Sequence, residues 1–590
     1  MRGLNRHAAV GLVLMAGFAY GCDDYLNTPP QGALDELTLA NEAGVEATLV
    51  GAYRMLGGNP DGWQGAPSNW AYGSITTDDA YKGSEASDQP DANALEYYSW
   101  GSPGAHNYLN GKWSAVYEGV SRANNTIRLL DRVLADDAGA ISQETADGIR
   151  GEALFLRAHF HFEAWRMWGN IPYYTETDED FRKPNTGTDP VPLILADLDA
   201  AASLLPESPR KGEVGRVTAW TARAYKGRVQ VYIGDYAGGA ETLRNVVQNG
   251  PYALEEDFHR VWTAFREFAN GPETILAYQA SVNDGEPNGQ NANSAERLNF
   301  PHSGSPLGCC GFHQPSQNLV NFFRVDDNGL PLAISVGDLQ PLSALEDWNG
   351  NDNNFTAANT APVDPRLDWT VGRDGVPYLD WGIHRSDLGW VRDISFGGYY
   401  NGKKHVHEKS ANAGSNVGWN PAHLNSVNIH IFRYADLLLL LAEAEVELGN
   451  LDAARQIVNQ IRERAGRVVQ GPGTSASDIA VPIDDPSITW ANYRIGLYPS
   501  FPSQEYARTA VRYERRLELA MEGQRMFDLQ RWNTFIPVLN DYVTVEKTRR
   551  PHKSASLEVT DRHRWFPIPD RQIELSEVDG ESRLQQNPGW

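Results

Sequence analysis

Two polar blocks of the chain, residues 68–110 and 282–428, combine aromatic rings with charged and amide side chains. They are rich in Gly, Pro, Asn and Ser and contain few helical runs. The first block contains Trp70, Tyr72, Tyr81, Tyr97, Tyr98 and Trp100 beside Asp78, Asp79, Lys82 and Asn93. The second contains Trp348, Trp369, Tyr378, Trp381, Trp390, Tyr399 and Tyr400 beside Asp380, Arg385, Arg392 and Asn401. Aromatic faces stack on the C–H face of a sugar ring, and carboxylate, amide and guanidinium groups bond to its hydroxyls, so both blocks have the residue types of a carbohydrate-binding surface.

The frequency of aromatic residues in these blocks indicates ordered loops rather than disordered tails. A stacked ring that covers on the order of 50 Å² contributes about 1 kcal/mol, so a binding surface needs several rings acting together. For any single aromatic residue here, the alternative is that its ring anchors a loop on the rest of the fold.

Helices must position these loops, because the remaining segments carry apolar residues at helical spacing. In residues 151–168, for example, Leu154, Ala158, Phe162 and Trp165 fall on one face. Comparable patterns cover residues 41–55, 113–134, 145–168, 191–205, 218–249, 430–465 and 505–529. The expected fold class is therefore mostly α, in a single domain over residues 41–590.

Two helical segments share one layout. Residues 218–250 are predicted to form a helix, a turn at Gly234 and a second helix, and residues 430–466 repeat this order around Gly449. Glycine suits the left-handed conformation that often ends a helix. Both segments read as tetratricopeptide-like hairpins, although any antiparallel helix pair shares this pattern.

The N-terminus has the pattern of a lipoprotein signal. Arg2, Arg6 and His7 form a positive head before an apolar run over residues 8–20, which is too short to span a bilayer. Ala19-Tyr20-Gly21-Cys22 resembles a cleavage site before a lipidated cysteine. We therefore predict a signal peptide over residues 1–21, lipidation of Cys22 and a tether over residues 22–40. An ordinary secretory signal followed by an unrelated cysteine is the alternative.

The composition agrees with an exported, membrane-anchored protein. Beyond Cys22 the strongest apolar run, residues 437–442, is far shorter than a transmembrane helix. The formal net charge is −25 at pH 7. Such a charge repels phosphate backbones, so we do not expect nucleic acid as a ligand.

Cys309 and Cys310 follow Cys22 as the remaining cysteines, and because they are adjacent they cannot close a long loop. In an oxidising compartment they either form a vicinal disulfide, eased by Gly308 and Gly311, or stay as two free thiols. If the bond forms, we expect it to rigidify a loop beside the ligand site.

Glutamates alternate with arginines at steps of three and four near the C-terminus, where Glu514, Glu518 and Glu522 lie among Arg512, Arg515, Arg516 and Arg525. This spacing predicts a packed helix with salt-bridged flanks and with Leu517 facing inward. We favour that structural role over an anion-binding or catalytic cluster.

Characteristic short motifs occur in order along the mature chain. The first are Cys22-Asp23-Asp24-Tyr25-Leu26 with Pro29-Pro30, then Gly169-Asn170-Ile171-Pro172 after the helical run that includes residues 152–158. Next come Gln317-Asn318-Leu319-Val320, Asp364-Pro365-Arg366 and Arg433-Tyr434-Ala435-Asp436. The last are residues 515–525, Phe566-Pro567-Ile568-Pro569 and Asn587-Pro588-Gly589-Trp590. In this order they resemble the SusD/RagB family of outer-membrane nutrient-binding lipoproteins.

This resemblance implies a SusD-like fold, with tetratricopeptide-like helix pairs as scaffold and a loop-rich region that binds the ligand. It implies a cell-surface lipoprotein of the outer membrane, anchored through Cys22 and without enzymatic activity or cofactor. Such a protein captures oligosaccharides and delivers them to a SusC-like TonB-dependent transporter, closing over it as a lid. Peptides or other nutrients taken up in the same way, a glycoside hydrolase and a protein-interaction scaffold are the alternatives.

Members of the family draw their ligand contacts from these two loop blocks, but no motif fixes individual residues there. We predict a platform formed by Trp100, Trp381 and Trp390, with Asp79 and Lys82 as partners for the sugar hydroxyls.

Catalytic and metal-binding motifs are absent from the sequence. It contains no G-x-S-x-G elbow, no H-E-x-x-H and no phosphate-binding glycine loop. His405 and His407 make only a weak metal site, and residues 347–358 depart from a calcium-binding EF-hand loop at Asp352 and Ala358, so a structural calcium ion there is unsupported. Glycoside hydrolysis stays open, because the separation of its two carboxylates is set in space.

Overall fold

A computed structural model describes residues 39–59, 62–332, 361–467, 470 and 488–590. The predicted signal peptide, Cys22, nearly all of the tether and the calcium-like residues 347–358 lie outside the described residues. Within the described ranges, no helix combines the length and the apolar character that crossing a bilayer requires.

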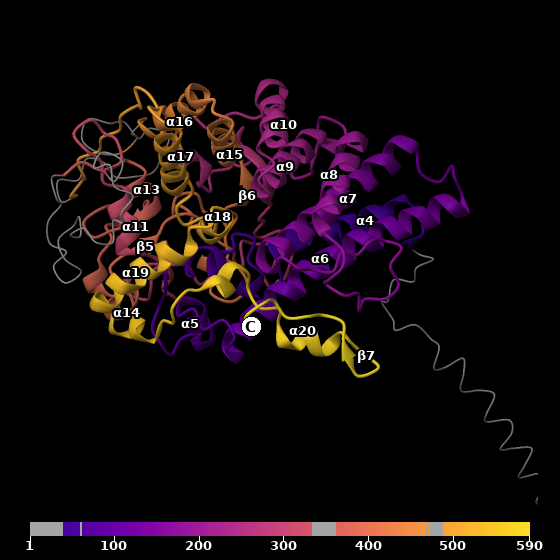
Figure 1. Ribbon diagram of the computed structural model, residues 1–590, viewed down its shortest axis with the longest axis horizontal. Helices are drawn as coiled ribbons and strands as arrows, with labels where there is room; N and C mark the ends of the chain where they lie inside the picture. Colours follow the sequence, from indigo (N-terminus) through magenta and orange to yellow (C-terminus); the bar gives the residue numbers. More distant parts are fainter. Residues whose placement is uncertain (1–38, 60–61, 333–360, 468–469, 471–487) are drawn as a thin grey trace, which may run out of the picture.

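A succession of packed helices forms the scaffold, running from indigo α4 and α6 through magenta to orange α16 and α17 in Figure 1. α6 packs on α4 and α7, α7 on α8, α8 on α9, α9 on α10, α10 on α15, and α15 on α16 and α17. Their bounds are α4 (Glu42–Arg54), α6 (Pro103–Asp136), α7 (Gln143–Trp168), α8 (Pro190–Leu204), α9 (Ala219–Tyr232), α10 (Tyr236–Asn249), α15 (Tyr434–Glu447), α16 (Leu451–Ala465) and α17 (Gln504–Leu519). The mostly helical fold is therefore confirmed.

Both predicted hairpins are present, as α9 with α10 and as α15 with α16. Gly234 and Gly449 follow the first helix of each pair with φ near +80°, the conformation that glycine adopts most easily. The start of the second segment differs from the prediction, because residues 429–433 form strand β6 (Ile429–Arg433). This strand pairs antiparallel with β2 (Thr274–Tyr278).

The predicted C-terminal helix over residues 505–529 is interrupted. α17 ends at Leu519, and α18 (Arg525–Arg531) begins after a turn in which Met521 and Gly523 have positive φ. Gly523 lies directly against the backbone of Ser68, since a Cβ atom added to it would stand 1.8 Å from the Ser68 carbonyl oxygen. The chain therefore breaks the helix where the first loop block packs on it.

Short elements order the two loop blocks and the C-terminal segment, mostly at the lower left of Figure 1. β1 (Ala80–Gly83) pairs antiparallel with β3 (Phe312–Pro315), which brings one block against the other. β4 (Val371–Gly372) pairs with β5 (Asn401–Gly402), and β7 (Glu577–Val578) with β8 (Glu581–Ser582). The short helices are α5 (Pro90–Glu96), α11 (Gln317–Phe322), α13 (Leu367–Thr370), α14 (Ile394–Gly397) and α20 (Asp570–Leu575), and the longer α19 spans Phe535–Arg549.

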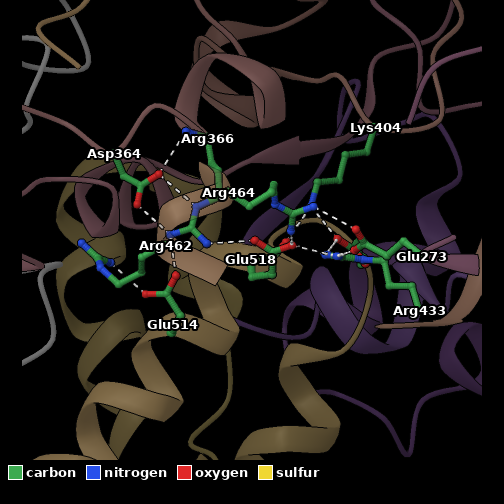
Figure 2. Close-up of polar contacts among 10 residues, drawn as sticks. Glu273, Asp364, Arg366, Lys404, Arg433, Arg462, Arg464, Glu514 and Glu518 are labelled. Atoms are coloured by element: carbon green, nitrogen blue, oxygen red, sulfur yellow. Dashed lines mark hydrogen bonds and ion pairs between the residues drawn. The ribbon is translucent and has the colours of Figure 1, made fainter. Parts of the chain in front are cut away.

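The C-terminal glutamates are buried, and they pair with distant segments rather than along their own helix. Glu514 bonds to Arg366 and Arg462 at 2.7 and 2.8 Å, and Glu518 contacts Arg366, Arg433 and Arg464 (Figure 2). The network contains five carboxylates and five cations: Glu273, Asp364, Glu514, Glu518 and Glu522 with Arg366, Lys404, Arg433, Arg462 and Arg464. The predicted packed helix is present and Leu517 is buried in it, but the expected pairing of these glutamates with arginines of the same helix is wrong, because their arginine partners are Arg366, Arg433, Arg462 and Arg464.

Burial alone would raise the pKa of Glu518, but the charges of Arg464, Arg433 and Arg366 outweigh it and hold that pKa far below its usual value. Buried charges are costly unless they are paired. Every charged group of this network has at least one oppositely charged partner, although Glu514 Oε1 and Arg464 Nε make no hydrogen bond. The network therefore fixes the middle loop block, through Asp364 and Arg366, to the helical scaffold.

Candidate functional site

The structure brings the two loop blocks together into one region. Beyond the β1–β3 pairing, Arg392 of the second block bonds to Glu85 and Asp88 of the first at 2.6 Å each. These contacts hold residues of the two blocks close together.

Trp100 is part of the core and offers no ring face to a ligand. Its side chain is fully buried, it stacks on Phe566 with 4.2 Å between ring centroids, and Trp590 lies 6.1 Å from it. Its indole nitrogen donates to the carbonyl oxygen of Leu95 at 3.0 Å. The prediction of Trp100 as a platform residue is contradicted by this packing.

Asp79 and Lys82 are also interior residues with partners of their own. Asp79 accepts a hydrogen bond from Arg516 Nε at 2.8 Å, and Lys82 Nζ donates to the carbonyl oxygens of Glu85 and Asp88 at 2.8 and 2.5 Å. Burial lowers the pKa of Lys82 to about 8. Neither side chain is open to sugar hydroxyls, so these two predictions are corrected as well.

Trp381 and Trp390 differ from each other in exposure. Trp390 is 5% exposed and packs edge-on against Tyr378 and His384. Trp381 is partly exposed, and its indole nitrogen donates to His407 O at 2.7 Å. The three tryptophans therefore do not form one platform, and Trp381 alone keeps part of its ring open.

Two other tryptophans, Trp63 and Trp419, reach the surface beside Arg297. We call these three residues the aromatic surface. Trp419 is 52% exposed and Trp63 is partly exposed. The guanidinium carbon of Arg297 lies 5.4 Å from the Trp63 ring centroid and 5.5 Å from that of Trp419. Two indoles with a guanidinium between them can stack on sugar rings and donate hydrogen bonds to their hydroxyls.

A series of ring contacts connects the aromatic surface to Trp381. The centroid separations are 6.4 Å from Trp419 to His423, 4.4 Å to Phe300, 6.5 Å to His407 and 5.3 Å to Trp381. Trp381 thus ends this series of ring contacts, and the buried Trp390 lies in the same hydrophobic cluster as Phe300.

Local structure holds both exposed indoles in place. Trp63 Nε1 donates to the hydroxyl of Tyr108 on α6 at 3.1 Å. Trp419 stands between Gly418 and Asn420, both with positive φ, in a tight loop tip. The residues Gly-Trp-Asn-Pro at 418–421 are a turn signal around a tryptophan, which could have identified Trp419 from the sequence; Trp63 lies just before the first block and has no such signal.

Comparison with known proteins places the chain in a family. The model of the SusD family matches residues 272–590, which is more than half of the chain. The chain belongs to the SusD family. A second family model, described as starch-binding associating with outer membrane, matches residues 24–231.

Relatives of this SusD-family protein match it over nearly the full length. SusD-like protein P38 of Formosa agariphila is 24% identical, with 90% of this chain and 91% of the relative covered, and SusD-like protein P25 of the same organism is 23% identical, with 96% of each covered. Among solved structures, a laminarin-binding SusD-like protein has a TM-score of 0.63 at 21% identity, covering 93% of this chain and all of the other. Surface glycan-binding protein A from Bacteroides fluxus has a TM-score of 0.63 at 22% identity, covering 93% and 99%. These structures share the fold.

Metal-binding clusters are not found in the described ranges, where no group of three or more His, Cys, Asp or Glu side chains is placed to hold an ion. His405 and His407, which the sequence suggested as a weak metal site, have different partners. His405 packs edge-on against Trp262, and His407 contacts the carbonyl oxygen of Ala422.

Cys309 and Cys310 form a vicinal disulfide at the junction of the two loop blocks. The backbone nitrogens of Cys310 and Gly311 donate to Phe300 O at 3.2 and 2.7 Å, and Gly311 O accepts from Ser84 N. The disulfide therefore lies in a loop that contacts the first block and Phe300. Phe300 is one of the rings between Trp419 and Trp381.

We expect a purified protein with Cys22 replaced by serine to resist thiol alkylation until it is reduced, because both remaining sulfurs are in the disulfide. Intact-mass spectrometry with and without reductant measures this. Alkylation of both cysteines in the unreduced protein would show two free thiols instead.

Glu296, the residue before Arg297, is a buried carboxylic acid. Ser68 Oγ and Asn299 Nδ2 both donate to it, the latter at 2.6 Å. Burial raises its pKa from the usual 4.5 to about 7, and these hydrogen bonds offset only part of that shift. The folded protein therefore keeps a proton at pH values where the unfolded chain has lost it.

Glu296 accordingly favours the folded state fully below the unfolded pKa of 4.5, and this contribution is lost as the pH rises to about 7. Glu296→Gln keeps a neutral side chain of the same shape, so we expect a flatter stability profile between pH 4.5 and 7. Urea unfolding at several pH values, with the exposed Glu574→Gln as control, measures it. If the free energy of unfolding changed with pH in the same way for the wild type and for Glu296→Gln, the raised pKa of Glu296 would be contradicted.

Proposed function

We propose that this SusD-family protein binds oligosaccharides at the aromatic surface. The observation that carries the proposal is the exposed indole of Trp419 and the partly exposed indole of Trp63, with the Arg297 guanidinium within 5.5 Å of both ring centroids. Two similar folds belong to proteins named as laminarin-binding and surface glycan-binding, which supports the same ligand class here. The family model described as starch-binding adds further support.

The aromatic surface suits capture and release rather than tight storage. Two stacked rings contribute about 2 kcal/mol in total, so additional polar contacts are needed and the affinity stays modest. Modest affinity suits a protein that must release its ligand to a transporter. We further propose that the protein is lipidated at Cys22, lies on the outer face of the outer membrane and delivers its ligand to a SusC-like TonB-dependent transporter, without cleaving it.

A glycan panel that includes laminarin and starch, measured by titration calorimetry, tests the ligand class. We expect at least one glycan to bind with a dissociation constant between about 1 μM and 1 mM. Binding of peptides with no glycan bound would replace the proposal. Release of reducing ends during prolonged incubation with the bound glycan would show a hydrolase.

The proposed lipid anchor at Cys22 and the proposed transporter partner are tested in cells. We expect the wild-type protein to fractionate with the outer membrane and to be cross-linked there to a TonB-dependent transporter, and Cys22→Ser to be released from the membrane. Membrane association of Cys22→Ser equal to that of the wild type would contradict the lipid anchor.

A further inference from the structure

A cavity that is separate from the aromatic surface lies where four scaffold elements meet. Its volume is about 460 Å³, within the range of small-molecule sites. The end of α7, the start of α8, the end of α9 and helix α18 form its walls, together with Arg564 and Trp565 from the C-terminal segment. We call it the Trp565 cavity.

Two indoles dominate its lining. Trp165 and Trp565 are partly exposed, with ring centroids 5.9 Å apart and planes inclined by 58°. Gly169 makes room for Trp565, because a Cβ atom added to this glycine would stand 2.7 Å from the indole. In the part of the chain that the structure describes, neither indole N–H has a hydrogen-bond acceptor. Partly buried tryptophan N–H groups usually have a hydrogen-bond partner, which a ligand in the cavity would supply.

The charges in the lining favour an anion. The lining contains three arginines, Arg166, Arg531 and Arg564, and one carboxylate, Asp189. Arg166 is paired with Glu163, and Arg531 with Glu443 and Asp528.

Arg564 differs from the other two arginines. It bonds to the amide oxygen of Asn533 and lies 5.6 Å from the Phe535 ring centroid, and no carboxylate among the described residues pairs with it. Asp189 is exposed and already accepts from Val191 N at 3.0 Å as the cap of α8. Arg564 is therefore the guanidinium of this lining that has no carboxylate within ion-pair distance among the described residues.

We propose that the Trp565 cavity is a second binding site, separate from the aromatic surface, for an acidic sugar unit: a pyranose that carries a carboxylate or sulfate group. One indole ring stacks on its C–H face, the other, inclined to it by 58°, donates its N–H to a hydroxyl, and Arg564 pairs with its anionic group. The proposal that the aromatic surface binds oligosaccharides does not depend on the Trp565 cavity.

Glucuronate and glucose form a matched pair of probes, because they differ only in the group at C6. In ligand-observed NMR titrations of the mature protein at low salt, we expect glucuronate to bind about tenfold more tightly than glucose. Glucose 6-sulfate should share the preference, which should shrink as salt is added. We expect Arg564→Gln to abolish the preference, Arg564→Lys to retain part of it, and Trp565→Ala to weaken both sugars.

Arg571→Gln is the matched control, because Arg571 is 63% exposed on α20 and pairs with Glu574 away from the cavity. Thermal unfolding of each variant checks that it is folded. Equal affinities for glucuronate and glucose, or a preference that survives Arg564→Gln, would overturn the proposal. Loss of glucuronate binding in Trp419→Ala would place that ligand on the aromatic surface and would also overturn it, while leaving the proposed function intact.

Discussion

Glu518→Gln should lower the free energy of unfolding by about 3–5 kcal/mol, the cost of removing one partner from a buried ionic network. Glu518 is fully buried and contacts Arg366 at 2.9 Å, Arg433 at 2.7 Å and Arg464. The variant keeps the size of the side chain but leaves these guanidinium groups with one negative charge too few. Urea unfolding followed by tryptophan fluorescence measures the loss, and a shift in melting temperature supports it if unfolding is irreversible.

The matched control for this prediction is Glu574→Gln, since Glu574 is 67% exposed in a surface pair with Arg571. Exposed pairs contribute about 0–1 kcal/mol, so this variant should be nearly as stable as the wild type. Because the pKa of Glu518 is lowered in the folded state, its contribution is present above the unfolded pKa and is lost as the pH falls. A loss below about 1 kcal/mol for Glu518→Gln at pH 7 would contradict the role of the network.

Trp100→Ala should destabilise the protein by about 3–5 kcal/mol, because it leaves a large cavity in the core. The ring is fully buried and is stacked against Phe566. The same substitution at Trp419, which is 52% exposed, should change the stability by less than about 0.5 kcal/mol. Unfolding curves of the two variants under identical conditions make the comparison. Similar small effects for both would mean that Trp100 is not a core residue.

Local patterns were enough to predict most of the scaffold. Apolar residues at helical spacing located α7 and α8 to within two residues at each end, and the glycines at 234 and 449 located the turns of both hairpins. The break after Leu519 was not predictable in this way, because it depends on the close approach of Gly523 to Ser68, which are distant in the chain.

The site was harder to predict than the scaffold, for the same physical reason. Trp100 lies in a polar, aromatic-rich block that is typical of a binding loop, but residues 566 and 590 at the C-terminus cover its ring. Asp79 is paired with Arg516, 437 positions away. Sequence composition indicates which blocks carry aromatic rings, but contacts over such separations decide which rings remain open.

Calorimetric titration of Trp419→Ala and Trp63→Ala, with a glycan that binds the wild type, tests the account most directly. Each stacked ring contributes about 1 kcal/mol, so each variant should bind about fivefold more weakly and the double variant about 25-fold more weakly. Phe181→Ala is the control, because Phe181 is 74% exposed but lies outside the aromatic surface, and it should bind like the wild type. Unchanged affinity in Trp419→Ala and in Trp63→Ala would contradict the aromatic surface as the glycan site.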